Sequence, residues 1–212
     1  TLPFIGIQPA IMDANGTELK CNQVNGSLCV KFPWPSIART IWGNHQRYKD
    51  TYFTTFENKY FTGDGALRDE SGYYRITGRV DDVIIVSGHN LGTAPIEDAI
   101  NEHPDVAESA IVGYPHDIKG NALYGYVTLK DSGKLRDEET LRKEINQSIT
   151  EHIGPIAKLN KIQFSDGLPK TRSGKIMRRI LRKIAHKESD NLGDLSTLLN
   201  PEVVQSVIDN AF

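Results

Sequence analysis

The spacing of apolar and polar positions along this 212-residue chain changes near residue 82. Before that point, short apolar runs alternate with turns rich in Gly and Asn, a pattern typical of strands. Residues 4–12 and 27–32 are predicted strands, and Asn15-Gly16 between them is a predicted tight turn. Residues 60–79 have the pattern of a further hairpin. We therefore predict that the first 80 residues consist of strands and turns.

From residue 82 onward, strand and helix patterns alternate. Thr93 is predicted to cap a helix that Pro104 stops, and Asp137 to cap a helix that Gly154-Pro155 closes. A third helix is predicted over residues 174–185, and a short one near the carboxyl terminus. The predicted strands are residues 82–87, 106–114, 122–130 and 158–164. The order β-α-β-β-α-β-α predicts a small α+β domain packed against one sheet.

The predicted fold class is therefore α+β, with a β-rich unit before a small α+β domain. Residues 1–81 form the β-rich unit, residues 82–190 the α+β domain, and residues 191–212 a polar tail with a short terminal helix. We place the boundary between the two units in the stretch from Arg79 to Asp82.

Composition narrows the class of protein. With 38% hydrophobic and 25% charged residues, the chain resembles an ordinary soluble globular protein. No apolar run approaches the roughly eighteen residues of a membrane span, and no signal peptide opens the chain. The strand-like beginning without an initiator Met indicates a fragment of a longer protein. Cys21 and Cys29 lack both metal-ligand spacing and a disulfide framework, so we expect reduced thiols in a cytoplasmic protein.

Positive charge is concentrated between residues 168 and 187. This segment holds eight of the 25 bases of the chain and none of its 27 acids. Such a cluster can bind nucleic acid, an anionic membrane or a small polyanion, or it can be the solvated face of a docked helix. An apolar stripe at helical spacing favours the docked helix for four of the bases. These four are Arg178, Arg179, Arg182 and Lys183.

Lys175 differs from the other bases of this segment. We predict it in the first turn of the helix, where the macrodipole disfavours a cation, and on a mobile loop. An anionic ligand explains that position better than stability does. The loop is not a P-loop, because G-x-x-x-x-G-K-[ST] requires Gly at 169 and Ser or Thr at 176, where this chain has Pro169 and Ile176.

Two stretches carry a resemblance to a known family. They are YFTGDGALRDESGYYRITGRVDDVIIVSGHNLGTAPIEDAI, residues 60–100, and LPKTRSGKIMRRILRKIA, residues 168–185. Together they resemble the corresponding stretches in the carboxyl-terminal third of the AMP-forming acetyl-CoA synthetases. These enzymes belong to the adenylate-forming superfamily. The resemblance covers essentially the whole chain. It implies that residues 1–81 end a large adenylate-forming domain and that residues 82–190 are a mobile carboxyl-terminal domain.

The resemblance implies an acetate–CoA ligase. Acetate and MgATP would give acetyl-adenylate and pyrophosphate, and the CoA thiolate would then attack the adenylate to release acetyl-CoA and AMP. ATP with Mg²⁺, acetate and coenzyme A are therefore the expected small molecules, and the fragment alone is expected to be inactive. Propionate or another short acyl group is the alternative acid. A nucleic-acid-binding or membrane-binding module is the alternative from a different class, although it explains only the basic segment.

The resemblance assigns nucleotide contacts to three residues. Asp64, in TGD, matches the carboxylate that binds the ribose hydroxyls, and an ionised carboxylate has acceptor oxygens for both. Arg79 matches an arginine that also binds the nucleotide. Asn90 stands where close relatives usually have an Arg on the phosphate, so this contact is expected to be weaker. Residues 150–152 also lack the base that relatives often use for a CoA phosphate.

Further assignments concern the two half-reactions. Asp81 matches the hinge of the domain rotation, and Ser87 and Gly88 match a loop that approaches CoA. Lys175 matches the lysine that stabilises developing negative charge during adenylation. It is also the expected site of regulatory acetylation, with a lysine acetyltransferase and a deacetylase as partners. We expect neither a nucleic acid nor a membrane as a partner.

A cation site is implied at the end of the helix over residues 94–103. In some relatives, backbone carbonyls that match those of Asn101, His103 and Val106 hold a metal ion. Orphan carbonyls at a helix C-terminus are suitable oxygen ligands, and water or an ordinary cap is the alternative. The imidazole of His103 is not expected to be the ligand.

Overall fold

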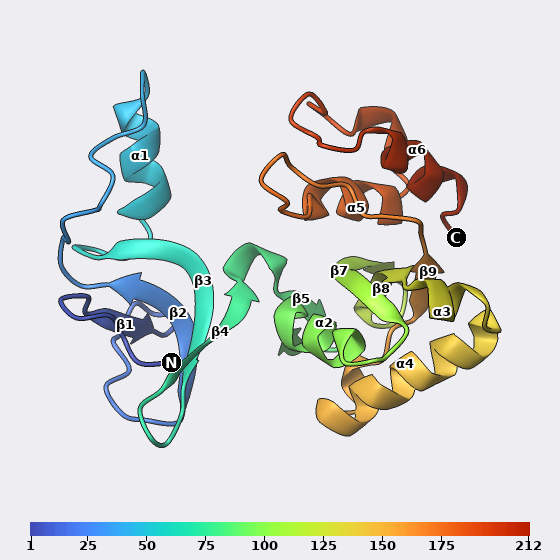
Figure 1. Ribbon diagram of the computed structural model, residues 1–212. Helices are drawn as coiled ribbons and strands as arrows, with labels where there is room; N and C mark the ends of the chain where they lie inside the picture. Colours follow the sequence, from blue (N-terminus) through green and yellow to red (C-terminus); the bar gives the residue numbers. More distant parts are fainter. The chain divides into compact units, whose positions relative to one another are not determined.

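A computed structural model describes residues 1–212, and it divides the chain into two units, Thr1–Asp82 and Val83–Phe212. Each unit has its own sheet (Figure 1), and the first unit buries one apolar cluster while the second buries two. The predicted α+β fold class is confirmed. None of the helices combines the length and the apolar character that a membrane crossing would need.

The amino-terminal unit is built on a four-stranded antiparallel sheet of order β1-β2-β3-β4. Its elements are β1 (Pro9–Met12), β2 (Val24–Val30), α1 (His45–Tyr52), β3 (Tyr60–Arg68), β4 (Tyr74–Arg79) and the 3-10 turn η1 (Val80–Asp82). The predicted turn at Asn15-Gly16 forms, with Gly16 at φ +81°. It leads into a bridge between Met12 and Glu18 rather than directly into β2.

Helix α1 contradicts the prediction that the first 80 residues contain only strands and turns. Asn44 caps it, because its side chain accepts a hydrogen bond from the backbone N–H of Arg47 at 2.9 Å. Tyr52 and Phe53 pack the helix against β3, where their rings contact that of Tyr60. This segment has little apolar periodicity, so aromatic packing and the cap, rather than a stripe, specify the helix.

The carboxyl-terminal unit has a five-stranded sheet of order β6-β5-β8-β7, in which β9 pairs in parallel with β8. Its strands are β5 (Ile84–Val86), β6 (His89–Leu91), β7 (Val106–His116), β8 (Gly120–Leu129) and β9 (Lys161–Phe164). Its helices are α2 (Thr93–Asn101), α3 (Asp131–Lys134), α4 (Glu138–His152), α5 (Arg178–Ala185) and α6 (Glu202–Asp209), with 3-10 turns η2 (Pro155–Ala157) and η3 (Ser189–Asn191).

Helices cover both faces of this sheet. Helices α2 and α4 lie on one face, and α5 and α6 lie on the other (Figure 1). The alternation along β7 explains the two layers, since Ile111 enters the cluster under α2 and α4 while Ala110 and Val112 enter the cluster under α5. The central stretch Ala110-Ile111-Val112 is therefore apolar on both sides of the strand.

The predicted helix caps in the second unit are partly right. Asp137 caps α4, with its carboxylate 2.8 Å from the backbone N–H of Thr140, and the helix ends before Gly154, at φ +121°. Thr93 is not a cap, however, because it is the first residue of α2 and Gly92 holds the cap position without a side-chain bond. Strand β6 and helix α3 are too short to leave a clear periodic pattern.

Residues 191–212 are more than a polar tail. Four of their apolar side chains belong to the same buried cluster as α5. These are Leu192, Leu198, Val204 and Val207. The segment thus completes the second apolar layer of the carboxyl-terminal unit. Both cysteines are free thiols, and burial raises the pKa of Cys29 to about 11.

Candidate functional site

Asp64, Arg79 and Asp81 lie together in the amino-terminal unit. Asp64 on β3 and Arg79 on β4 are direct register partners, and the guanidinium Nη1 lies 3.6 Å from the Asp64 carboxylate. Arg79 Nε also donates to Asp81 at 3.0 Å, and Nη1 donates to the carbonyl oxygen of Thr62 at 3.2 Å. The arginine therefore holds two carboxylates around one half-exposed cation, and oxygens of Asp64 are available to further donors.

Gly63 makes this arrangement possible. Its φ is +78°, and an added Cβ would lie 2.6 Å from the nitrogens of the Arg79 guanidinium. Any larger side chain would displace Arg79 and strain the backbone. The glycine of the TGD motif is therefore required by the position of the arginine.

Ser87, Gly88 and Asn90 share the hairpin between β5 and β6. Ser87 has φ +48° and Gly88 has φ +83°, so both central residues of the turn have positive φ, as a type I′ turn requires. The backbone N–H of Ser87 donates to the carbonyl oxygen of Lys119 at 3.1 Å. Asn90 pairs with Ile85 in the ladder and is exposed. A ligand at this hairpin would therefore meet the backbone of Ser87 and Gly88 and the uncharged side chain of Asn90.

Lys175 lies on a hydrogen-bonded hairpin and not in the first turn of a helix. Helix α5 begins at Arg178, and Lys170 and Ile176 form an antiparallel bridge before it. The backbone of Lys175 is bound on both sides by Thr171, whose N–H donates to its carbonyl oxygen at 2.8 Å and whose hydroxyl accepts from its N–H at 3.1 Å. The prediction that Lys175 lies in the first turn of the helix is therefore wrong, and its side chain is exposed.

The bases of α5 are bound within the protein, which corrects the prediction of a solvated face. Arg178 forms a two-point ion pair with Glu97 of α2, with Nη2 at 2.6 Å and Nε at 3.3 Å. Arg179 donates to the carbonyl oxygens of Leu192 and Asp194, and the Lys183 ammonium donates to that of Asn191. This charge is largely used to hold the following segment, so it gives little support to a nucleic-acid-binding or membrane-binding module.

The end of α2 contains a charged network around the three residues predicted to hold a cation. His103 Nδ1 accepts from the backbone N–H of Asp105, and Nε2 lies 3.1 Å from Glu144. Arg136 bridges Asp105 at 2.8 Å and Glu144 at 2.7 Å. Hydrogen bonds from Ser132 and Arg136 lower the pKa of Asp105, and bonds from Arg136 and His103 lower that of Glu144.

This network leaves only backbone oxygens for a cation. Both ring nitrogens of His103 are engaged, and the side chain of Asn101 accepts from Ser109 at 2.9 Å. The carbonyl oxygen of His103 accepts from the N–H of Val106 at 3.1 Å, which leaves its second lone pair. A cation bound here would therefore rely on the carbonyls of Asn101, His103 and Val106.

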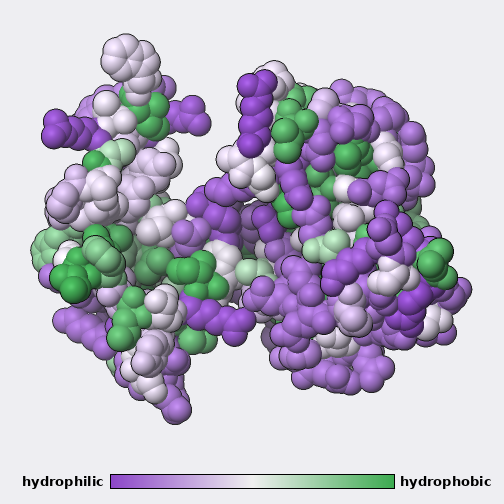
Figure 2. Space-filling model, in the orientation of Figure 1, coloured by the Kyte–Doolittle hydropathy of each residue, from purple (hydrophilic) through white to green (hydrophobic).

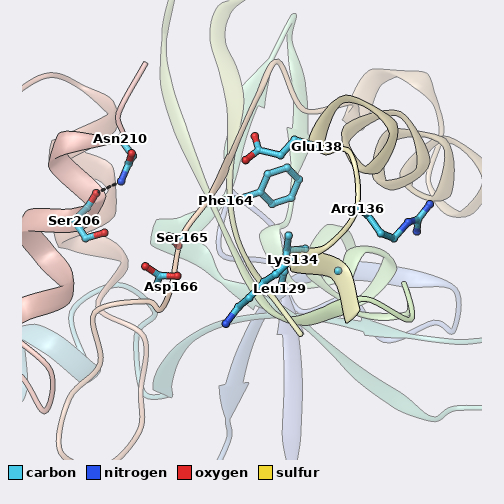
Figure 3. Close-up of a pocket in the computed structure, with 10 residues that line it drawn as sticks. Leu129, Lys134, Arg136, Glu138, Phe164, Ser165, Asp166, Ser206 and Asn210 are labelled. Carbon is cyan, nitrogen blue, oxygen red and sulfur yellow. Dashed lines mark hydrogen bonds between the residues drawn. The ribbon is translucent and has the colours of Figure 1, made fainter. Parts of the chain in front are cut away.

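A separate polar pocket lies between α3, β9 and α6 (Figure 3). Its volume is about 220 Å³, and none of the predicted site residues lines it. Its lining includes Lys134, Glu138 and Asp166, and Asn210 there donates to the carbonyl oxygen of Ser206 at 2.8 Å. Because the pocket is lined by side chains of both charges, it does not indicate a particular ligand. The candidate functional residues remain those of the preceding paragraphs.

Part of the carboxyl-terminal unit matches a known family. The family described as the AMP-binding enzyme C-terminal domain matches residues 95–175. The matched segment lies wholly within the carboxyl-terminal unit, Val83–Phe212. The match begins in the first turn of α2 and ends at Lys175. Lys175 is therefore the last matched residue, on the hairpin that precedes α5.

The relatives extend the likeness over nearly the whole chain. The acetyl-coenzyme A synthetase of Brucella anthropi is 56% identical over 99% of the chain, and that of Syntrophobacter fumaroxidans is 58% identical over the same share. The chain covers 32% of each relative, so it spans about a third of their length. The acetoacetyl-CoA synthetase from Streptomyces lividans shares the fold, with a TM-score of 0.82 and 23% identity, over 98% of this chain and 31% of that one.

Two residues that hold parts of the carboxyl-terminal unit together, Glu97 and Asn200, did not follow from the sequence. Glu97 is buried and accepts from the backbone N–H of Ile111 at 2.9 Å while it binds Arg178. Asn200 binds the segment that leads to Lys175. Glu97 had a sequence signal, because a charged residue sits between Ile96 and Ala99 on the apolar side of α2. Asn200 had none.

Proposed function

We propose that this chain is the carboxyl-terminal third of an AMP-forming acetate–CoA ligase. The observation that carries the proposal is its 58% identity, over 99% of its length, to an acetyl-coenzyme A synthetase. The pairing of Asp64 with Arg79 at 3.6 Å supports it, because a nucleotide ribose needs a carboxylate held in place. The remaining two thirds of the enzyme would supply the acyl pocket and most of the ATP site.

In this proposal, the residues of the chain divide between two steps. For adenylation, the Asp64 carboxylate accepts from the ribose hydroxyls, and the Lys175 ammonium lies beside the acetate and phosphate oxygens as the new bond forms. Preorganised positive charge there stabilises the developing negative charge. Mg²⁺ would enter with ATP. For thioester formation, the β5–β6 hairpin with Ser87 and Gly88 approaches CoA, whose thiolate attacks the carbonyl carbon and releases AMP.

The amino-terminal unit carries an apolar surface that fits this proposal. Figure 2 shows apolar side chains gathered on that unit, while the visible face of the carboxyl-terminal unit is mainly hydrophilic. The most exposed large apolar side chains of the amino-terminal unit are Phe4 at 82%, Ile5 at 93% and Trp42 at 98%. Large apolar patches of this kind mark interaction sites. We assign them to contact with the rest of the large adenylate-forming domain.

Regulation and location belong to the same proposal. Lys175 is exposed on a short hairpin, which makes it accessible to a lysine acetyltransferase and a deacetylase. Acetylation would remove the charge that adenylation needs. The enzyme would act in the cytoplasm. We further propose that Asp81 is the hinge, that Asn90 gives a weaker phosphate contact than Arg would, and that the carbonyls of Asn101, His103 and Val106 can hold a cation.

Replacing Lys175 by Ala in the full enzyme tests the proposal. Loss of one preorganised charge should slow acetate-dependent exchange of pyrophosphate into ATP by about a hundredfold or more. Formation of acetyl-CoA from supplied acetyl-adenylate should remain within about twofold, since Lys175 serves only the first step. Lys134→Ala, a change of another exposed lysine, is the control and should alter neither step. Near-normal exchange, or equal loss of both steps, would overturn the assignment of Lys175.

The choice of acid needs its own measurement. We propose acetate as the acid because the relatives are named acetyl-coenzyme A synthetases. Propionate is the competing substrate. The ratio of kcat/KM for acetate to that for propionate in the full enzyme decides between them, and a ratio below one would reassign the substrate without changing the role of Lys175.

A further inference from the structure

The hairpin that carries Lys175 is held by a segment that follows it in the chain. Its first strand, residues 168–171, lies between two neighbours. On one side, the backbone N–H of Met177 donates to the carbonyl oxygen of Pro169 at 2.8 Å. On the other, the N–H of Leu199 donates to the carbonyl oxygen of Lys170 at 2.8 Å, and Thr171 forms a bridge with Leu198. Residues 198–200 thus act as a third strand.

Asn200 completes this third strand with its side chain. Its Oδ1 accepts from the backbone N–H of Lys170, and its Nδ2 donates to the carbonyl oxygen of Leu168, both at 2.9 Å. Pro169 between them has no N–H, so a backbone ladder could not continue regularly there. One amide therefore supplies the missing donor and acceptor on either side of the proline.

The supporting segment is itself fixed to α5. Arg179 and Lys183 bind carbonyl oxygens of residues 191–194, and Gly193, at φ +76°, leaves room for the Arg179 guanidinium where a Cβ would lie 2.6 Å from it. Leu198 is buried in the apolar cluster under α5. Lys170 adds an ion pair to Glu108 of β7 at 2.6 Å. The Lys175 hairpin is consequently anchored to the body of the unit at its first strand.

We infer that Asn200 is a positioning residue for adenylation, which acts by fixing the hairpin that presents Lys175. This inference rests on the proposed role of Lys175. Asn200 touches no reacting group; it removes freedom from the strand opposite Lys175, so that the ammonium is placed before the substrates arrive. Misplacing a catalytic group by about 1 Å costs roughly a hundredfold in rate.

Two variants of the full enzyme test the inference. Asn200→Ala removes both hydrogen bonds and should lower kcat for acetate-dependent pyrophosphate exchange by about tenfold to a hundredfold, with the KM for ATP within about twofold. Thioester formation from supplied acetyl-adenylate should be unchanged. Asn200→Asp keeps an acceptor for Lys170 but loses the donor to Leu168, so its exchange rate should fall between the wild type and Asn200→Ala. Asn210→Ala is the matched control, because Asn210 bonds only within its own turn at Ser206.

Amide hydrogen exchange supplies a readout that does not depend on catalysis. Peptides covering 168–177 should exchange faster in Asn200→Ala, while peptides from α2 and α4 keep the wild-type rate. Unchanged exchange in 168–177, or an equal loss of both half-reactions, would overturn the role of Asn200. If Lys175→Ala abolishes adenylation while Asn200→Ala leaves it intact, the inference fails and the proposed function stands. If Lys175→Ala has no effect on adenylation, the proposed function fails whatever the hydrogen exchange gives.

Discussion

Individual side chains in this protein are placed by their neighbours across a strand or a sheet edge. Arg79 reaches Asp64 only because Gly63 has no Cβ, and the same arginine holds Asp81 at 3.0 Å. Asn200 likewise acts through two backbone groups that lie 30 and 32 residues away. In both cases a small or neutral residue decides where a charged one stands.

Gly63→Ala should weaken nucleotide binding in the full enzyme. The added methyl group displaces the Arg79 guanidinium, so the KM for ATP should rise about tenfold, because a charge-assisted contact is lost. The control is Gly16→Ala, which has a similar φ of +81° but only one side-chain atom at 4.0 Å, of Phe56, near its added Cβ. Both variants share a backbone cost of about 1–2 kcal/mol, which thermal unfolding measures. An equal KM in the two variants would show that Arg79 does not bind the nucleotide.

Besides apolar packing, a small number of charged contacts join helices to strands, and they differ in their exposure to solvent. Glu97 on α2 binds the N–H of Ile111 on β7 and the guanidinium of Arg178 on α5, so it joins elements on both faces of the sheet. Asp105, Arg136 and Glu144 form a second such link between the start of β7 and α4. These contacts fix how the elements pack, beyond what apolar burial alone specifies.

Arg178→Ala should destabilise the protein by about 3 kcal/mol, because it leaves the carboxylate of Glu97 buried without its cation. Glu97 is only 10% exposed at its side chain, whereas Asp131, the partner of Lys134, is fully exposed. Lys134→Ala is therefore the control and should change the free energy of unfolding by less than about 0.5 kcal/mol. Urea unfolding measures both. A similar small change in the two variants would mean that the Glu97 pair adds nothing to stability.

Acid should weaken the Asp105–Arg136–Glu144 link. The pKa of both carboxylates is lowered in the folded state, so their stabilisation is present above their ordinary values, about 3.9 and 4.3, and is lost as pH falls through the lowered values. Arg136→Gln should reduce this lowering, mainly for Glu144, because Ser132 still donates to Asp105. The urea midpoint should therefore fall less steeply between about pH 5 and pH 3 than in the wild type. Arg142→Gln, which removes a partly buried arginine paired with Glu138 and Glu139 instead, should keep the wild-type slope. Parallel curves for wild type and Arg136→Gln would contradict the prediction.

The division of the molecule into two units falls directly after Asp81 and Asp82. Each unit buries apolar side chains of its own, and η1, residues 80–82, is the last element of the first unit. A short 3-10 turn between two separately packed units is a natural place for a pivot, since few residues need to change conformation.

Asp81→Pro should therefore separate the two half-reactions of the full enzyme. Proline fixes φ and restricts the preceding residue, so rotation about this point is lost. The variant should carry out one of the two steps, pyrophosphate exchange or thioester formation, near the wild-type rate. The rate of the other step should fall at least tenfold. Asp81→Ala, which loses only the side chain bonded to Arg79, should affect the two steps to the same extent. Equal loss of both steps in the proline variant, with an unchanged circular dichroism spectrum, would place the pivot elsewhere.

Local pattern was sufficient for much of this protein. The cap at Asp137, the stop at Gly154 and the apolar runs of β7 and β8 follow from short-range rules, because caps, turns and strand alternation involve residues close in the chain. The resemblance in residues 60–100 and 168–185 indicated acetyl-CoA synthetases, and two of the relatives described above have that name. The start of α5 and the hairpin before it did not follow. Arg178 binds Glu97 81 residues away, and Lys170 binds Asn200 30 residues away. Bonds between such distant positions leave no periodic signal, so only the folded chain reveals that Lys175 is held on an anchored hairpin.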